Sequence, residues 1–136
     1  MTMRFGIVLA LLAFGAQASR TVWDGAYTEV QAKRGEAVYA DRCASCHAAD
    51  LSGMDQAPPL TGADFLSGWT DQSLNDLFER IRISMPADKP GSLERPQVAD
   101  VMAFILQKNS FPAGQTDVAA SEDSLKAIRI VAKKPL

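Results

Sequence analysis

Two cysteines and one histidine within five residues constrain this chain more than any other feature of its sequence. Cys43 and Cys46 are separated by two residues, and His47 follows directly. In this order the two thiols can add to the two vinyl groups of a porphyrin, and the imidazole then lies beneath the iron as its proximal ligand. The motif therefore predicts one covalently attached haem c, bound by Cys43, Cys46 and His47.

Paired cysteines at this spacing also occur in other kinds of site, and the rest of the sequence argues against each of them. A structural zinc site needs four ligands, whereas the chain has two cysteines and one histidine in total. A thioredoxin-like redox site lies within an alternating pattern of strands and helices, which we do not find in this sequence. A disulfide across two residues would close a very small loop and constrain little of the unfolded chain.

The N-terminus predicts export across the cytoplasmic membrane. Arg4 precedes an apolar run over residues 5–16, and the small residues Ala16 and Ala18 flank a glutamine. This is the pattern of a secretory signal peptide cleaved after Ala18. The apolar run is shorter than the roughly 20 residues that span a bilayer, so a retained anchor is the weaker alternative. Because haem is attached covalently outside the bacterial cytoplasm, we expect a periplasmic protein with no membrane span after cleavage.

The length and charge of the chain limit the remaining possibilities. Residues 1–18 are the predicted signal peptide, and residues 19–136 suffice for one domain with one core. Within them we expect a haem domain over 19–110 and a C-terminal extension over 111–136, with a short helix at 121–131. Acidic side chains outnumber basic ones by 16 to 14. This balance argues against nucleic acid as a partner.

Apolar residues at helical spacing predict three main helices. The first runs from about residue 29 to 42 and leads into the cysteine motif, and the second runs from 73 to about 83. The third begins near Ser92 and carries its apolar stripe through Leu106. The segments between them are irregular and rich in proline and glycine, as expected of loops that wrap a cofactor. The sequence therefore predicts an all-α fold, with three main helices plus loops wrapped around one haem.

The second axial ligand of the iron cannot be another histidine of this chain, because His47 is the only one. Two of the five methionines lie in the predicted signal peptide, and Met102 lies in the apolar stripe of the last helix, where we expect it to pack. Met54 follows the proximal histidine closely and would have to turn back around the porphyrin. Met85 ends the second helix, since Pro86 stops the helix there. The sequence favours Met85, with Met54 as the weaker alternative.

From about residue 32 to 109 the chain resembles a class I cytochrome c, the small monohaem electron-transfer family. Gly35, Tyr39 and Phe104 match the family's contact between its first and last helices, and the pair Met85-Pro86 resembles its distal ligand loop. The resemblance implies a haem iron with one histidine and one methionine ligand, and a role in electron transfer.

Two further residues take roles from the same resemblance. In the segment Ala57-Pro58-Pro59-Leu60, it implies that the carbonyl of Pro58 accepts the hydrogen bond of the proximal imidazole and so fixes the ring. It also implies that Trp69 donates its indole N–H to a haem propionate. An ordinary buried tryptophan is the alternative reading of Trp69.

A second resemblance, in residues 22–28 and 76–82, is to cytochromes found with quinoprotein (PQQ-dependent) alcohol dehydrogenases. It implies redox protein partners such as a quinoprotein dehydrogenase as donor and a terminal oxidase or another cytochrome as acceptor. We therefore expect a one-electron carrier of a respiratory chain rather than an enzyme. The alternatives are a cytochrome subunit of a fixed dehydrogenase complex, and a haem protein with an open iron site that binds ligands or reduces peroxide.

Overall fold

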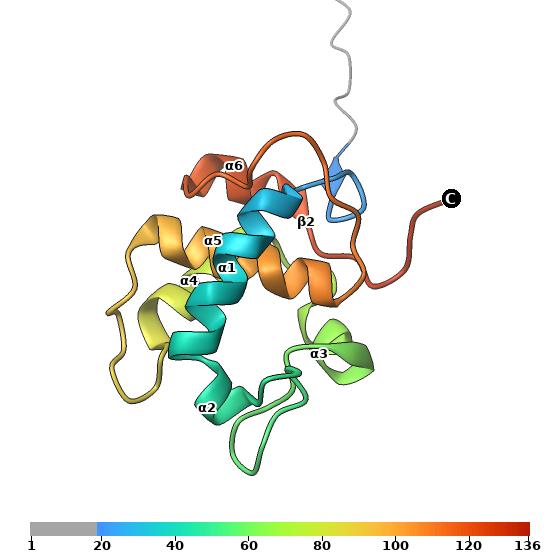
Figure 1. Cartoon of the computed structure of the whole chain (residues 1–136). Coiled ribbons are helices and arrows are strands. Elements are labelled where there is room, and N and C mark those ends of the chain that lie inside the picture. The colour runs from blue at the N-terminus through green and yellow to red at the C-terminus, as the bar shows by residue number, and fades with distance from the viewer. Residues whose placement is uncertain (1–18) are drawn as a thin grey trace, which may run out of the picture.

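The computed structural model describes residues 19–136, and the predicted signal peptide lies outside the described residues. Helices dominate the described chain, together with two short strands (Figure 1). In chain order the elements are β1 (Arg20–Thr21), α1 (Glu29–Arg42), α2 (Ala44–His47), α3 (Gly62–Trp69), α4 (Leu74–Ser84), α5 (Arg95–Lys108), α6 (Glu122–Lys126) and β2 (Ile128–Arg129). None of the helices within residues 19–136 has the length and apolar character of a membrane span. The all-α prediction is confirmed.

Helices α1 and α5 cross at the centre of the molecule (Figure 1). Gly35 permits this crossing, because a Cβ atom at that position would lie 1.8 Å from the carbonyl oxygen of Asp100. Beside it, the rings of Tyr39 and Phe104 pack with their centroids 5.3 Å apart. The three residues that carry the resemblance therefore form the contact between the two helices.

Helix α4 leads the chain to Met85. Its first turn is closed by a capping box, in which the amide of Asp76 donates to the Ser73 hydroxyl and the amide of Ser73 donates to the Asp76 carboxylate. Pro86 has no N–H and disfavours helix in the residue before it, so the helix ends at Ser84 and Met85 is extended. The buried face of the helix consists of Leu74, Asn75, Leu77, Phe78 and Ile81.

Helix α3 is a short helix in addition to the three predicted main helices, in a segment that we expected to be irregular. Residues 62–69 form two helical turns between the cysteine motif and α4. Phe65 and Trp69 lie one turn apart, and their ring centroids are 6.4 Å apart. Two glycines in eight residues lower the intrinsic helix propensity, so the helix depends on these tertiary contacts and is weakly marked in the sequence.

The C-terminal extension returns to the N-terminal end of the described chain, where β1 and β2 pair in parallel (Figure 1). The helix expected over 121–131 is too long, because α6 ends at Lys126 and Ile128 instead enters β2. The extension packs onto the rest of the molecule through its apolar side chains. Those that are buried are Phe111, Val118, Leu125, Ile128 and Ile130.

Candidate haem site

A cavity of about 1050 Å³ lies at the end of the molecule that carries α2. This volume is at the upper limit of the roughly 300–1,000 Å³ typical of pockets for small molecules and cofactors. Apolar side chains from α3, α4 and α5 form much of its wall, including Phe65, Leu77, Ile81, Val101 and Ile105. All the site residues predicted from the sequence line this one cavity: Cys43, Cys46, His47, Pro58, Trp69 and Met85.

His47 is held at the wall of the cavity by the short helix α2 and by the loop that follows. Its backbone N–H donates to the carbonyl of Cys43 over 3.0 Å. Its ring atom Nδ1 lies 2.8 Å from the carbonyl oxygen of Pro58, so with the proton on Nδ1 the ring donates to that oxygen. The other ring nitrogen, Nε2, then has a lone pair with which to bind iron. This is the contact that the resemblance implies for Pro58.

The two cysteines are free thiols beside this histidine. Cys46 is exposed, whereas Cys43 is partly buried, and burial raises the pKa of the Cys43 thiol to about 11. Reactive redox thiols have a lowered pKa, because the thiolate is the nucleophile. The environment of Cys43 therefore differs from that of a thioredoxin-like site, whereas two free thiols next to a ligating imidazole suit attachment of haem.

Two methionines line the cavity, and they come from different segments. Met54 is 46% exposed and lies in a tight turn closed by two backbone hydrogen bonds with Ala57, of 2.7 and 3.0 Å. Because this turn leads directly to Pro58, Met54 belongs to the loop that holds the proximal imidazole. Met85 is partly buried and reaches the cavity from the end of α4. Met102 is fully buried in α5 and does not line the cavity. Of the methionines in the described chain, the arrangement therefore favours Met85 as the second axial ligand.

Trp69 ends α3 at the cavity. The indole of the other tryptophan, Trp23, donates to the carbonyl of Val131 over 2.8 Å, whereas the Trp69 indole has no hydrogen-bond partner among residues 19–136. A partly buried indole N–H usually finds a partner. Trp69 lines the cavity, which leaves its role as a propionate donor, or as an ordinary partly buried tryptophan, a prediction.

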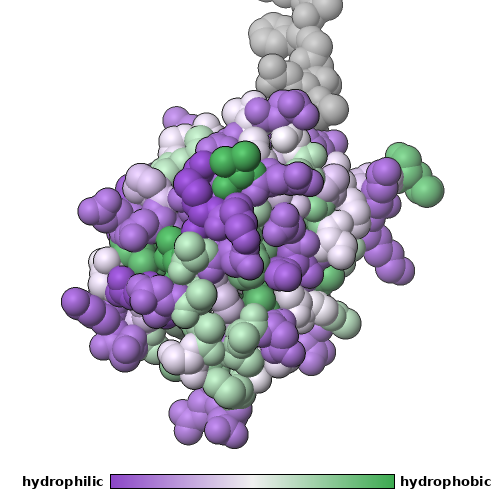
Figure 2. Space-filling model, in the orientation of Figure 1, coloured by the Kyte–Doolittle hydropathy of each residue, from purple (hydrophilic) through white to green (hydrophobic). Residues whose placement is uncertain are grey.

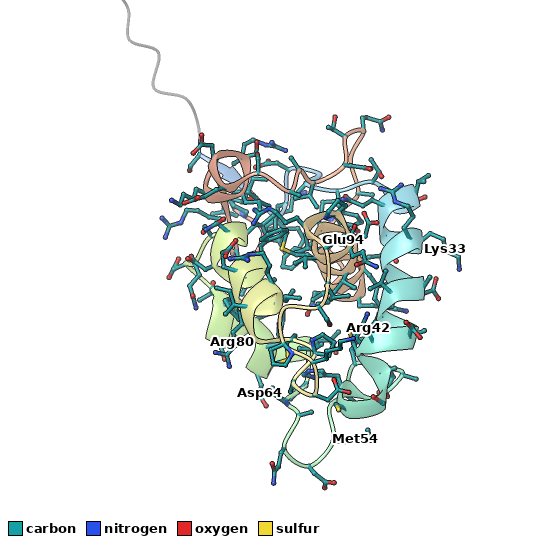
Figure 3. The ribbon with its side chains drawn as sticks, turned by 90° about the vertical axis from the view of Figure 1, so that its left-hand side faces the viewer. Lys33, Arg42, Met54, Asp64, Arg80 and Glu94 are labelled. Atoms are coloured by element: carbon teal, nitrogen blue, oxygen red, sulfur yellow. The ribbon has the colours of Figure 1, made fainter. Side chains whose placement is uncertain are left out.

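Sequence analysis does not single out some polar residues at this end of the molecule. Figure 3 shows Arg42 on α1 and Arg80 on α4 on either side of it, with Met54 and Asp64 toward the lower edge. The guanidinium of Arg42 also donates to the hydroxyl of Ser92, beyond the Met85 loop. Charged side chains on helices are usually solvated, so no spacing or motif in the sequence marks Arg42 or Asp64 as part of the site.

The donor set fits a haem c. Two adjacent thiols, an imidazole with one nitrogen oriented by a carbonyl, a thioether and an apolar wall lie around one cavity. These are the groups that attach and ligate such a haem.

Comparison with known proteins identifies the family of the chain. Residues 30–105 match the family described as "Cytochrome C oxidase, cbb3-type, subunit III". The match covers more than half of the chain and includes the cysteine motif and Met85. The chain belongs to this family of c-type cytochromes. As a member of an oxidase-subunit family, this cytochrome is an electron-transfer protein and not an enzyme in itself.

Among curated proteins, this cytochrome is 30% identical over 87 residues to the "Cbb3-type cytochrome c oxidase subunit CcoP" of Rubrivivax gelatinosus. The alignment covers 63% of this chain and 28% of that relative, so this cytochrome spans less than a third of its relative's length. Neither comparison bears on the predicted association with quinoprotein alcohol dehydrogenases.

Among solved structures, this cytochrome is similar to the crystal structure of the sulfane dehydrogenase SoxCD from Paracoccus pantotrophus. The TM-score is 0.55 at 18% sequence identity, and the superposition covers 95% of this chain and 68% of that chain. At this level of identity the likeness is one of fold alone. It agrees with the cytochrome c fold predicted from the sequence.

Proposed function

We propose that this cytochrome is a periplasmic one-electron carrier that uses a single covalent haem c with His47 and Met85 as axial ligands. One observation carries the proposal: a single cavity brings together the two thiols, an imidazole oriented by Pro58, and the thioether of Met85. A bound haem supplies a reversible one-electron couple at its iron.

The residues around the cavity would adjust that couple. The carbonyl of Pro58 accepts a hydrogen bond from Nδ1–H of the His47 ring, and this bond makes the imidazole a more basic ligand. A thioether such as that of Met85 favours the reduced iron. The apolar wall excludes water and disfavours the extra positive charge of the oxidised state, which acts in the same direction. We expect a higher potential than two nitrogen ligands would give.

The surface beside the cysteine motif suits repeated, short-lived docking. Small side chains such as Ala44 and Ser45 lie there, and Figure 2 shows weakly hydrophobic residues gathered over α2 at the lower end of a largely polar face. Transient redox partners use small interfaces of this kind. We propose a dehydrogenase as the electron donor, with a quinoprotein dehydrogenase as the first example to test, and a terminal oxidase or another cytochrome as the acceptor.

A fixed subunit of a larger complex is the second candidate, because the curated relative is itself named as a subunit of an oxidase. A permanently bound subunit usually exposes a contiguous apolar patch. Within residues 19–136, the exposed large apolar side chains come from four separate segments: Val30, Met54, Ile83 and Leu136. Because each of these segments contributes a single exposed large apolar side chain, none of them forms an apolar stripe of its own, and this supports the mobile carrier.

The optical spectrum of the protein expressed with periplasmic haem attachment tests the axial ligands. We expect a weak sulfur-to-iron band near the red end when the protein is oxidised, and no carbon monoxide binding when it is reduced. Met85→Ala should remove the band and allow carbon monoxide to bind, whereas the matched variant Met54→Ala should change neither. Loss of the band in Met54→Ala would assign the ligand to Met54. Ready binding of carbon monoxide by the unaltered protein would favour an open iron site.

Two simpler measurements test the periplasmic carrier. Mass spectrometry of the periplasmic fraction should find residues 19–136 carrying one haem, and a retained residue 1–18 segment would contradict cleavage after Ala18. Gel filtration of the same fraction should find the protein as a monomer. Elution only within a large complex would favour the fixed subunit.

A further inference from the structure

The chain has two tyrosines, and both are buried and donate to a backbone carbonyl. The Tyr27 hydroxyl donates to Phe111, and the Tyr39 hydroxyl donates to Ala48, over 2.6 Å in each case. Each tyrosine is 2% exposed. They differ in place, because Tyr39 lines the haem cavity and Tyr27 does not.

The carbonyl bound by Tyr39 belongs to the residue that directly follows His47. Ala48 has a φ of 67°, in the left-handed region that an alanine rarely adopts. The chain leaves α2 at this residue, and the amide of Leu51 donates to the same carbonyl over 3.2 Å. A strained backbone of this kind persists only where its surroundings hold it. The phenol of Tyr39 is the side chain that holds it from α1.

The loop that begins at Ala48 ends at the hydrogen-bond partner of the histidine ring. Within it, Gly53 donates to the carbonyl of His47 over 2.9 Å, and the loop then turns back to Pro58. The Pro58 carbonyl lies 2.8 Å from Nδ1 of His47. A displacement of Ala48 would therefore move the backbone on one side of the ring and its hydrogen-bond acceptor on the other.

We propose that Tyr39 is a positioning residue for the proximal ligand, because its hydroxyl fixes Ala48 and thereby holds the His47 ring against Pro58. The sequence resemblance assigns to Tyr39 only the helix contact that its ring makes with Phe104. The inference rests on the proposed haem attachment and on His47 as an axial ligand. It does not depend on Met85, on the redox partners or on the cellular compartment.

The two tyrosines provide a matched pair of variants. Tyr39→Phe and Tyr27→Phe each keep the buried ring and lose one hydroxyl that donates over 2.6 Å. Since the net contribution of one such bond is similar at both sites, we expect each variant to lower the folding equilibrium constant about fivefold. Stability alone therefore does not separate the two, and a readout at the iron is needed.

The first readout is the ratio of reduced to oxidised protein at a fixed solution potential. A weaker bond from His47 to Pro58 makes the imidazole less basic and stabilises the oxidised iron less. We expect Tyr39→Phe to raise the ratio about threefold to tenfold, where tenfold corresponds to about 59 mV for one electron. Tyr27→Phe should leave the ratio unchanged.

The second readout is the set of NMR resonances of the His47 ring in the oxidised protein, which should move in Tyr39→Phe and not in Tyr27→Phe. If both variants lose stability alike and neither the ratio nor these resonances change, the hydroxyl serves folding only and the proposal is wrong. Where Tyr39→Phe does not fold, Tyr39→p-aminophenylalanine keeps a weaker donor and should raise the ratio by a smaller amount; an unchanged ratio would again contradict the proposal. Failure of the proposed function would be visible earlier, as an unaltered protein without a c-type spectrum or without ligated His47.

Discussion

At the scale of single residues, Gly35 is the position where packing leaves least room. A Cβ atom there would lie 1.8 Å from the carbonyl oxygen and 2.4 Å from the carbonyl carbon of Asp100. Both are backbone atoms of α5, so the clash is relieved only if the two central helices separate. Gly68, which is also helical and lines the haem cavity, has no atom of this chain within 4 Å of the place where its Cβ would lie.

We therefore expect very different effects on stability from the same substitution at these two glycines. Gly35→Ala should lower the free energy of unfolding by more than about 3 kcal/mol or prevent folding, because backbone atoms cannot give way as a flexible side chain can. Gly68→Ala should change it by no more than about 1 kcal/mol, because alanine has the higher helix propensity and its Cβ would meet no atom of this chain. Urea unfolding of the two variants measures both effects. Similar changes in the two would show that the crossing is not as tight as the distances imply.

Arg42 connects the proximal and distal sides of the cavity. It directly precedes Cys43, and its guanidinium donates to Ser92 at the far end of the loop that begins with Met85. Loss of this bond should free the loop. A hydrogen bond to a charged group contributes about 1.5–3 kcal/mol when buried and less at this partly exposed site. Without the bond, we expect the fraction of molecules in which the Met85 loop has moved away from the iron to be about fivefold larger.

Carbon monoxide binding to the reduced protein measures that open fraction. Arg42→Gln and Ser92→Ala should each increase binding by the same factor, and the double variant should add nothing further. Arg34→Gln is the control, because Arg34 forms its ion pairs with Asp100 and Asp117 and does not line the cavity. Additive effects in the double variant would contradict a direct link.

Residues whose chemistry is local could be recognised from the sequence, and those that act through space could not. Spacing alone predicts the roles of Cys43 and His47, and the proline that follows Met85 favours it over the other methionines as a ligand. The Tyr39 hydroxyl and the Arg42 guanidinium act on residues 9 and 50 positions away, respectively. The path of the intervening loops decides these contacts, and no periodicity in the sequence encodes that path.

At the scale of elements, α4 bears directly on the site because Met85 follows its last residue. Its capping box provides acceptors for two backbone amides at the start of the helix. The amide of Asp76 donates to the Ser73 hydroxyl, and the amide of Ser73 donates to the Asp76 carboxylate. Ser73→Ala should lower the free energy of unfolding by about 1 kcal/mol, within the usual range of about 0.5–2 kcal/mol for a lost N-cap.

Urea unfolding measures this loss, with Ser67→Ala as the control. The Ser67 hydroxyl donates to a carbonyl within α3 at an exposed position, so its removal should cost less than about 0.5 kcal/mol. An equal loss in both variants would mean that the cap contributes no more than an ordinary surface hydroxyl.

The elements predicted correctly are those with a long apolar period. Residues 29–42 form α1 as expected, and α4 and α5 lie within a few residues of their predicted ranges. The sequence does not predict α3, whose glycines obscure a helix of only eight residues. It also overextends the helix at 121–131, since β2 exists only because β1, more than a hundred residues earlier, pairs with it. Pairing over such a separation leaves no local signal.

At the scale of the whole molecule, the C-terminal extension is tied to α1 through a buried amide. Gln31 is 2% exposed, and its side chain donates to the carbonyl of Val118 over 3.0 Å and accepts from the amide of Val118 over 2.7 Å. Next to it, the Asp117 carboxylate accepts from Thr28 and, over 2.6 Å, from Arg34. Residues of and beside α1 therefore bind both the backbone of Val118 and the carboxylate of Asp117.

The charge makes a testable contribution to acid stability. Hydrogen bonds from Thr28 and then from Arg34 hold the pKa of Asp117 below its ordinary value of 3.8. A pKa lowered by folding adds stability above the unfolded value, and this stability is lost as the pH falls through the lower, folded value. Because both partners of the ion pair are nearly half exposed, the contribution should be below about 1 kcal/mol.

Asp117→Asn should therefore lower the urea midpoint slightly at pH 6 and not at a pH well below the folded pKa of Asp117, where the two proteins should converge. Unfolding curves across this range measure the difference. The comparison variant is Asp123→Asn, because Asp123 makes no ion pair among residues 19–136. A difference that persists unchanged in acid would mean that the carboxylate acts through packing rather than through its charge.

The extension as a whole is expected to be part of the folding unit rather than an appendage to residues 19–110. Its five buried apolar side chains remove surface worth about 1.5–3 kcal/mol each, or about 8–15 kcal/mol before the entropy of ordering the segment is subtracted. The extension is also hydrogen-bonded to the N-terminal segment of the described chain, since the amide of Gly114 donates to the carbonyl of Tyr27 over 2.6 Å and the indole of Trp23 donates to the carbonyl of Val131 over 2.8 Å. The net stability of a domain is only about 5–15 kcal/mol.

Deletion of residues 111–136 should therefore leave a chain that attaches haem poorly and unfolds at much lower urea concentration, although its whole haem site is retained. Deletion of residues 133–136, which are exposed, is the control and should leave the urea midpoint unchanged. If the shorter chain unfolded at the same midpoint as the full one, residues 19–110 would be a complete domain and the extension would be free to serve another purpose. The buried contacts at Gln31, β1 and α4 argue for the opposite: removing the segment would expose apolar surface at the end of the molecule away from the haem cavity.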